Sequence, residues 1–136
     1  MKRLRSGPSM VAGFTLIELM LVIGVIAVLS AIAIPSYLEQ VRKSRRGAVK
    51  ADMVEYAQRA ERQHSSSNTY AGYALPYTVS PREGGTAYYI LKVDTTPSTF
   101  KITATPQGAQ TKDSCGELSI DQANRKTSTG TLSNCW

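Results

Sequence analysis

The sequence predicts an α+β fold in which a long N-terminal helix packs on a small antiparallel β-sheet. Three observations lead to this prediction. An almost wholly apolar run extends from Phe14 to Ile34. Apolar residues at helical spacing follow this run, and segments that alternate apolar with polar residues occupy the second half of the chain.

The apolar run has the length of a membrane-spanning helix. At about 1.5 Å per residue it extends about 30 Å, which is the thickness of a hydrocarbon core. We therefore predict a transmembrane helix over residues 14–35 and a globular domain over residues 36–136. Pro35 lacks a backbone N–H donor and is expected to kink the helix where the two parts meet.

The helical pattern continues beyond the proline. Apolar residues recur at spacings of three and four, as in an amphipathic helix packed against a core. These residues are Val49, Met53, Tyr56, Ala57 and Ala60. The sequence therefore predicts one helix to about residue 64, whose second half carries the globular domain.

Segments with strand character follow the helix. Residues 87–94 are rich in β-branched and aromatic side chains, and residues 98–106 alternate apolar with polar ones. The short turn between them predicts an antiparallel hairpin. Residues 116–122 are expected to form a third strand and residues 125–129 a fourth.

Two cysteines, Cys115 and Cys135, lie near the end of the sequence. Beyond a membrane segment the domain is expected in an oxidising compartment, which favours a disulfide between them. A bridge closing a loop of this size contributes about 3 kcal/mol in the chain-entropy model. The alternative is a pair of reduced thiols.

Positive charge is concentrated at the two ends of the apolar run. The formal net charge of the chain is +6, and removal of residues 1–13, which carry three basic and no acidic side chains, leaves +3. Beyond the run, a second group of cations is expected to face lipid headgroups, with filament or DNA contacts as alternatives. This group consists of Arg42, Lys43, Arg45 and Arg46.

The stretch "GFTLIELMLVIGVIAVLSAIAIPSY" closely resembles the N-terminus of type IV pilins and pseudopilins. The resemblance implies a pilin-like fold and removal of a basic leader, residues 1–13, by a prepilin peptidase that cuts between Gly13 and Phe14. It also implies N-methylation of Phe14. Residues 61–73 and the ending "NCW" resemble minor pilins of the PilE type, in which a disulfide bounds a variable loop. An ordinary signal peptide remains the alternative, because Ala31–Ala33 matches a small-residue cleavage pattern.

Glu18 places a carboxylate close to the start of the apolar run. It lies four residues after Phe14, so it can reach the membrane interface and remain hydrated. The resemblance implies a second role, in which Glu18 pairs with the N-terminal amine of a neighbouring subunit and sets the axial register. A low dielectric would strengthen such a pair.

The sequence carries no recognisable catalytic constellation and predicts neither an enzyme nor a cofactor. His64 is the only histidine and is expected to be solvated, with no Ser or Cys nucleophile assigned to it. No metal-ligand motif is present. The spacing of Asp113, Glu117 and Asp121 does not fit a calcium loop, so these are expected to be surface acids.

The predicted function is that of a minor structural subunit of a type IV pilus, supporting assembly, twitching motility, adhesion or DNA uptake. The resemblance implies these partners: other pilin subunits, the prepilin peptidase, the assembly platform and motor, and the inner membrane. Lys and Arg counts alone place the C-terminal side in the cytoplasm, whereas the resemblance places the domain in the periplasm and then in an extracellular fibre. Three alternatives remain: a type II secretion pseudopilin, a DNA-binding competence pilin, and an unrelated single-span anchored protein.

Overall fold

The structure, a computed structural model, describes residues 13–131 and 133–136, so residues 1–12 of the expected leader (residues 1–13) lie outside the described residues. The chain divides into one compact unit that ends at Tyr37 and a second from Leu38 to Trp136, called the head below. Helix α1 (Leu16–Ser67) contributes to both units. The remaining elements, in chain order, are β1 (Val79–Ser80), β2 (Tyr89–Thr95), β3 (Phe100–Pro106), the 3₁₀ helix η1 (Gly108–Lys112), β4 (Leu118–Asp121) and β5 (Lys126–Ser128).

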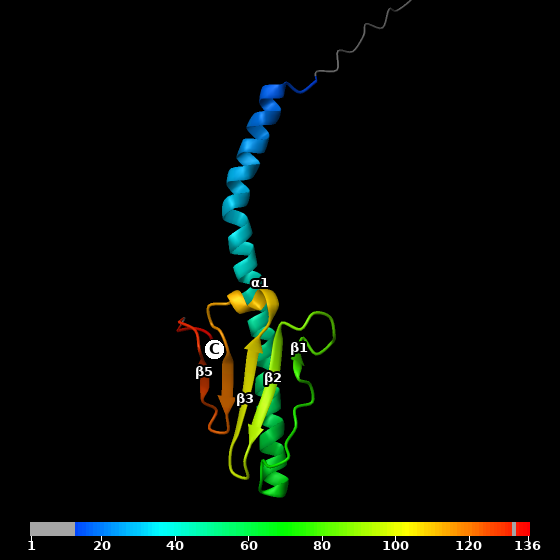
Figure 1. Ribbon diagram of the computed structural model, residues 1–136, viewed down its shortest axis with the longest axis vertical. Coiled ribbons are helices and arrows are strands. Elements are labelled where there is room, and N and C mark those ends of the chain that lie inside the picture. The colour runs from blue at the N-terminus through cyan, green and yellow to red at the C-terminus, as the bar shows by residue number, and fades with distance from the viewer. Residues whose placement is uncertain (1–12, 132) are drawn as a thin grey trace, which may run out of the picture. The chain divides into compact units, whose positions relative to one another are not determined.

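The strands of the head form one antiparallel meander, ordered β1-β2-β3-β4-β5, in which each strand pairs with its neighbours in sequence (Figure 1). The predicted hairpin is confirmed as β2–β3, which pairs Tyr89 with Pro106 at one end and Thr95 with Phe100 at the other. The third and fourth predicted strands correspond to β4 and β5, with shorter bounds. Strand β1 and helix η1 are not predicted by the sequence.

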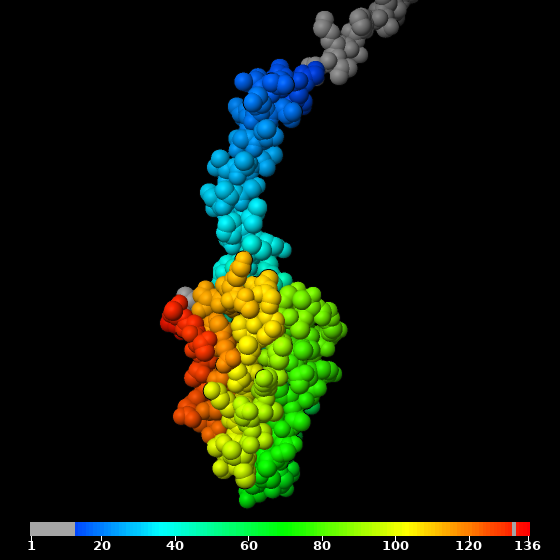
Figure 2. All heavy atoms as spheres, viewed as in Figure 1, coloured from blue at the N-terminus to red at the C-terminus, as the bar shows by residue number. Residues whose placement is uncertain are grey.

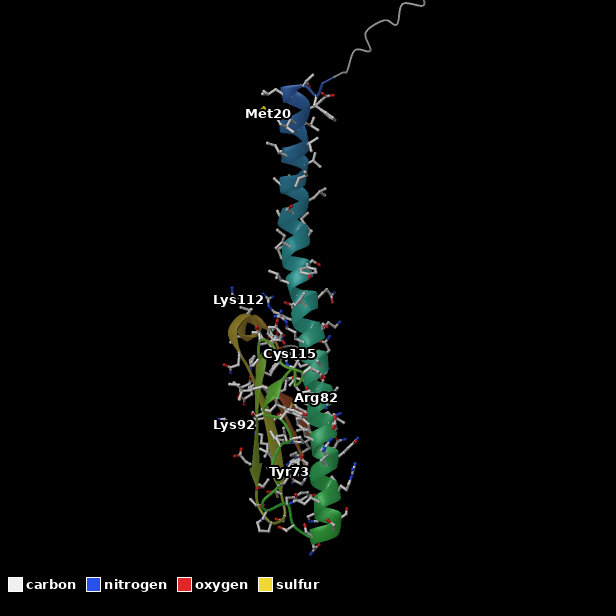
Figure 3. The ribbon with its side chains drawn as sticks, turned by 90° about the vertical axis from the view of Figure 1, so that its right-hand side faces the viewer. Met20, Tyr73, Arg82, Lys92, Lys112 and Cys115 are labelled. Atoms are coloured by element: carbon white, nitrogen blue, oxygen red, sulfur yellow. A yellow bond between two sulfur atoms is a disulfide. The ribbon has the colours of Figure 1, made fainter. Side chains whose placement is uncertain are left out.

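Within the head, the second half of α1 packs against one face of this sheet. Figure 3 shows the two layers edge-on, with Tyr73 and Cys115 between them and Lys92 on the far side of the sheet. All five residues of the predicted helical stripe are buried. They meet inward-facing side chains of the strands, such as Leu91, Ile102 and Leu118, each at most 1% exposed. The predicted α+β fold is therefore confirmed.

The outer face of the sheet is polar. Along β2 and β3, buried residues alternate with exposed ones, as expected for strands covered on one side. Lys92, Asp94 and Lys101 are the exposed charged residues on these two strands. Figure 2 shows this face of the head as a continuous surface formed mainly by β2 and β3.

Helix α1 ends three residues later than the predicted limit, at Ser67. Asn68 adopts a left-handed conformation with φ of 55°, and its N–H donates to the His64 carbonyl at 2.7 Å. This is a common way to end a helix, because the left-handed residue turns the chain and satisfies a terminal carbonyl. Pro35 lies within α1, and the kink expected there stays a prediction.

His64 is half-buried rather than fully solvated, which corrects the prediction for this residue. Its imidazole stacks on the Tyr70 ring with 4.2 Å between ring centroids. Tyr70 in turn packs edge-on against Phe100 and donates its hydroxyl to Glu61. The histidine therefore contributes to the packing at the end of α1.

Candidate functional site

The first half of α1 exposes an apolar surface along its whole length. The side chains of Leu16, Ile17 and Ile34 are 78%, 72% and 58% exposed. Among the described residues, α1 is the one helix long and apolar enough to cross a membrane, and its most apolar window has no buried residue. Nothing within the described chain covers this surface, so it requires lipid or another protein around it.

Thr15 and Glu18 form a capping box at the start of α1. The Glu18 backbone N–H donates to Thr15 Oγ1 at 3.3 Å, while the Thr15 backbone N–H donates to Glu18 Oε2 at 2.8 Å. The Thr15 hydroxyl also donates to Oε2 at 2.8 Å. This reciprocal pattern satisfies helix donors that would otherwise lack partners. The Thr-x-x-Glu spacing of Thr15 and Glu18 is the sequence signal for this cap.

Only one oxygen of Glu18 takes part in this cap. Both hydrogen bonds from Thr15 reach Oε2, and no hydrogen bond within the described residues reaches Oε1. The carboxylate can therefore hold the helix terminus and accept a second, external donor at once. Capping of the helix is therefore structurally compatible with the subunit pairing that the resemblance implies for Glu18.

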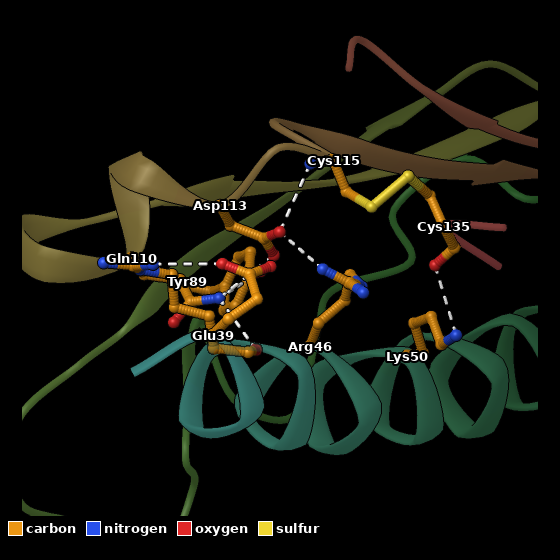
Figure 4. Close-up of polar contacts among 9 residues, drawn as sticks. Glu39, Arg46, Lys50, Tyr89, Gln110, Asp113, Cys115 and Cys135 are labelled. Carbon is orange, nitrogen blue, oxygen red and sulfur yellow. Dashed lines mark hydrogen bonds and ion pairs between the residues drawn. A yellow bond between two sulfur atoms is a disulfide. The ribbon is translucent and has the colours of Figure 1, made fainter. Parts of the chain in front are cut away.

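A buried polar cluster joins α1 to the segment after β3 (Figure 4). It consists of Arg46, Tyr89, Gln110 and Asp113, which are each at most 5% exposed. Asp113 Oδ1 pairs with the Arg46 guanidinium and also accepts the Cys115 backbone N–H at 3.2 Å. Asp113 Oδ2 accepts the Tyr89 hydroxyl and the Gln110 amide, each at 3.1 Å.

This cluster holds η1 against the helix. The Gln110 amide also donates to the Arg42 carbonyl on α1, at 3.0 Å. A charge can be buried at low cost only when it is paired and hydrogen-bonded. The Asp113 carboxylate satisfies both conditions, because it has several hydrogen-bond donors and a guanidinium partner. Burial raises the pKa of Tyr89 to about 12, so its hydroxyl stays protonated and able to donate to Asp113 at neutral pH.

The expectation of three surface acids is wrong for Asp113, which is 4% exposed. The other two remain partly exposed. Glu117 accepts the Thr105 hydroxyl at 2.9 Å, and Asp121 pairs with Arg125 at 2.7 Å. Local sequence could not separate Asp113 from the other two acids, because its partners Arg46 and Tyr89 are distant in the chain.

Cys115 and Cys135 form the predicted disulfide. The bridge encloses β4 and β5 and ties the C-terminal segment to the start of β4. Two further contacts hold this region: the Gly130 N–H donates to the Cys115 carbonyl at 3.0 Å, and Lys50 Nζ donates to the Cys135 carbonyl at 3.1 Å. Gly130 has no substitute here, because an added Cβ would lie 1.9 Å from the Ser114 carbonyl oxygen.

The basic group after the apolar run does not act as one patch. Arg42 pairs with Glu39 at 3.0 Å, and the Arg45 guanidinium lies 3.6 Å from the centre of the Tyr88 ring. Arg46 is buried in the polar cluster, so the expected lipid or DNA contact is wrong for this residue. Lys43 is exposed and has no ion pair among the described residues.

Comparisons with known sequences match most of the chain. The family described as type IV minor pilin ComP, DNA uptake sequence receptor, matches residues 35–119. The prokaryotic N-terminal methylation motif matches residues 8–34.

Prepilin peptidase-dependent protein D of Escherichia coli (strain K12) is 69% identical over 32 residues, which cover 24% of this chain and 22% of that protein. The type IV major pilin protein PilA of Myxococcus xanthus (strain DK1622) is 32% identical over 72 residues, covering 53% of this chain and 33% of that one. The matches thus span at most a third of these two curated relatives.

Two solved structures share the fold. A type IV pilin from Shewanella oneidensis aligns with a TM-score of 0.56 and 28% identity, covering 70% of this chain and 97% of that chain. The non-core minor pilin PilV of Neisseria meningitidis aligns with a TM-score of 0.54 and 18% identity, covering 71% and 95%. The second likeness concerns the fold alone.

The buried polar cluster makes a testable contribution to stability. Asp113→Asn leaves the Arg46 guanidinium buried without a countercharge, so we expect the free energy of unfolding to fall by about 3–5 kcal/mol. The double variant Arg46→Met/Asp113→Asn removes both charges and keeps a side-chain oxygen as acceptor for the buried donors, so it is expected to lose less. Denaturant unfolding of the full chain in nonionic detergent, followed by near-ultraviolet circular dichroism, measures both.

The exposed pair Arg125–Asp121 provides the matched control, because Arg125 is 73% exposed. Arg125→Met is expected to change the free energy of unfolding by less than about 1 kcal/mol. Equal losses for Asp113→Asn and Arg125→Met would contradict the role assigned to the cluster.

Proposed function

The chain belongs to the ComP family of type IV minor pilins, and we propose that it is a minor structural subunit of a type IV pilus. In this role it is inserted in the inner membrane with the head in the periplasm, and is then transferred into an extracellular fibre with other pilin subunits. The peptidase, assembly platform and motor are other proteins. The role is structural and requires no catalysis by this chain.

The observation that carries this proposal is the uncovered apolar half of α1. Its large apolar side chains are exposed all round the helix from Leu16 to Ile34, unlike those of the second half, where one stripe is buried. A helix that is apolar on every side needs apolar surroundings on every side. Lipid supplies these before assembly, and the helices of neighbouring subunits supply them in a fibre.

Exchange of lipid for protein yields less free energy than exchange of water for protein. The usual value of about 25 cal/mol per Å² applies to surface removed from water, whereas here one apolar environment replaces another. Helix packing and polar pairs must therefore contribute to assembly. This requirement supports a role for Glu18, whose Oε1 atom accepts no hydrogen bond within the described residues.

The methylation motif at residues 8–34 supports processing at the start of the apolar run. We infer that a prepilin peptidase cuts between Gly13 and Phe14, that residues 1–13 are lost, and that Phe14 is N-methylated. The new amine then lies one helical turn from Glu18, so it can pair with the Glu18 carboxylate of an adjacent subunit.

A second candidate function is binding of duplex DNA for uptake. The matching family is described as a DNA uptake sequence receptor, and its match includes most of the head. This description favours a pilus-associated DNA receptor over a secretion pseudopilin. Phosphate contacts by Lys and Arg would supply most of the affinity.

Processing predicts a mature chain that starts at N-methylated Phe14. Intact-mass and N-terminal peptide mass spectrometry of the protein from membranes should show loss of residues 1–13 and one added methyl group. Gly13→Leu should retain the leader because it alters the residue before the cut. A mature chain that retains residues 1–13, or that starts after Ala33, would contradict the proposal.

Glu18→Gln tests the pairing role separately from the cap. Glutamine retains the oxygen that caps the helix but removes the negative charge. We expect normal processing and membrane insertion, with a loss of subunit from sheared surface fibres detected by immunoblot. Glu39→Gln, outside the apolar run, serves as the matched control. Incorporation of the Glu18→Gln variant at the normal level would argue against the pairing.

The DNA-receptor function predicts salt-sensitive binding by the purified full chain in nonionic detergent. A fluorescent duplex should be retained at 50 mM salt and released progressively as salt rises, because counterions compete for the phosphates. Fluorescence anisotropy measures this directly. Absence of binding at 50 mM salt would reject this second function and leave the structural role unaffected.

A further inference from the structure

The cations of the head fall into two classes. Every ion pair in the described part of the chain uses an arginine, with partners such as Glu39, Asp113 and Asp121. No described lysine lies within ion-pair distance of a carboxylate. These lysines are Lys43, Lys50, Lys92, Lys101, Lys112 and Lys126. The lysines, together with Arg62 and with Arg45, which packs on the Tyr88 ring, are therefore the described cations whose charge no ion pair offsets.

Three of these lysines gather on one flank of the head. Lys43 and Lys50 are seven residues apart on α1, which places them two turns apart on the same helix face. Lys50 and Lys126 both line an open groove of about 460 Å³ between α1 and β5, with Trp136 as a further part of its wall. Lys43, Lys50, Lys126 and Trp136 are called the lysine flank below.

The C-terminal segment fixes the arrangement of this flank. Lys50 Nζ donates to the Cys135 carbonyl, and Cys135 is held by the disulfide. The Trp136 indole N–H donates to the Thr127 carbonyl on β5 at 2.8 Å. Lys126 Nζ lies 5.6 Å from the Trp136 ring centroid. The groove is thus built by ordered contacts rather than by chance proximity of flexible side chains.

The positive charge of the lysine flank is not neutralised locally. Burial lowers the pKa of the Lys50 ammonium, and the positive charges of neighbouring side chains lower it further. These neighbours are Arg46, Lys126 and Lys43. The carboxylate that lines the groove, Glu55, is already shared by Arg59 at 2.8 Å and Arg82 at 2.8 Å.

The outer face of the sheet offers a less positive alternative. Lys101 lies between Asp94 on β2 and Asp121 on β4, which are its partners in the strand register. Cross-strand neighbours of opposite sign partly offset its charge. The acids near the lysine flank are paired with arginines: Glu55 with Arg59 and Arg82, and Asp121, which lines a neighbouring groove with Lys126, with Arg125 at 2.7 Å. The flank therefore keeps positive charge that attracts an anionic polymer.

We propose that the lysine flank binds the phosphate backbone of duplex DNA, with Lys43, Lys50 and Lys126 contacting phosphates. Trp136 packs against the deoxyribose between these contacts. Gly47, which has no side chain, and the small Ala51 are exposed on the same helix surface and let the DNA backbone approach closely. This inference rests on the second proposed function and assigns its binding surface.

The experiment measures binding of a labelled 30-bp duplex to the full chain in nonionic detergent across a salt series. Lys50→Gln/Lys126→Gln is compared with wild type and with Lys92→Gln, a matched lysine on the opposite side of the sheet. If each flank lysine makes one phosphate contact, the slope of log affinity against log salt falls by about 0.9 per lysine. Between 50 and 200 mM salt, wild type then loses about tenfold more affinity than the double variant. Lys92→Gln should match wild type.

Circular dichroism checks that each variant is folded. Lys43→Gln is a further variant, chosen because the Lys43 side chain is exposed and makes no hydrogen bond within the described residues. Suppose that wild type binds DNA and that the slope of log affinity against log salt is unchanged in both Lys50→Gln/Lys126→Gln and Lys43→Gln. That result would reject the lysine flank as the binding surface, while the DNA-receptor function would stand. An equal loss in Lys92→Gln would also reject it. Absence of binding by wild type rejects the DNA-receptor function itself, so the two failures are distinguishable.

Discussion

The head depends on the burial of one stripe of α1 beneath the antiparallel sheet. Val49, Met53 and Tyr56 have no exposed surface, and the inward side chains of β2, β3 and β4 meet them. Burial of apolar surface is the main favourable term in such a small domain. The position of this stripe then determines where Arg46 lies, one turn before Val49 and under the segment that carries Asp113. The polar cluster is thus a consequence of how the helix is covered.

The two halves of α1 show how one helix suits different surroundings. From Leu16 to Ile34 apolar side chains lie on all sides of the helix, and all of the large ones are exposed. In the second half, only a stripe at three- and four-residue spacing is apolar and buried. The first pattern is suited to lipid or to a bundle of like helices, and the second to a single sheet. The capping box of Thr15 and Glu18 lies at the start of the first half, where an unsatisfied N–H in lipid would cost several kcal/mol.

Periodicity in the sequence predicts the long helix, the hairpin and the buried stripe, because each is a local pattern. The pairing of Cys115 with Cys135 is predicted as well, because a chain with two cysteines allows one intramolecular bridge. The sequence does not predict β1, whose two residues are too short for a pattern and pair only because β2 is adjacent. Nor does it predict the burial of Asp113, since the ion pair with Arg46 joins residues 67 positions apart. The spacing of Thr15 and Glu18 is sufficient to predict a cap, because a capping box is a local pattern as well.

The separation of arginines from lysines has an evolutionary consequence. The ion pairs that connect parts of the head, such as Arg46–Asp113 and Arg82–Glu55, use guanidinium groups. The planar arrangement of N–H donors in a guanidinium matches the two oxygens of a carboxylate. The lysines contribute no ion pair within the described residues. Substitutions of the exposed lysines, such as Lys43 and Lys92, can therefore alter the surface potential with little effect on folding. Relatives of this chain can diverge in what their surfaces attract while they retain the same scaffold, and selection can act on the two properties independently.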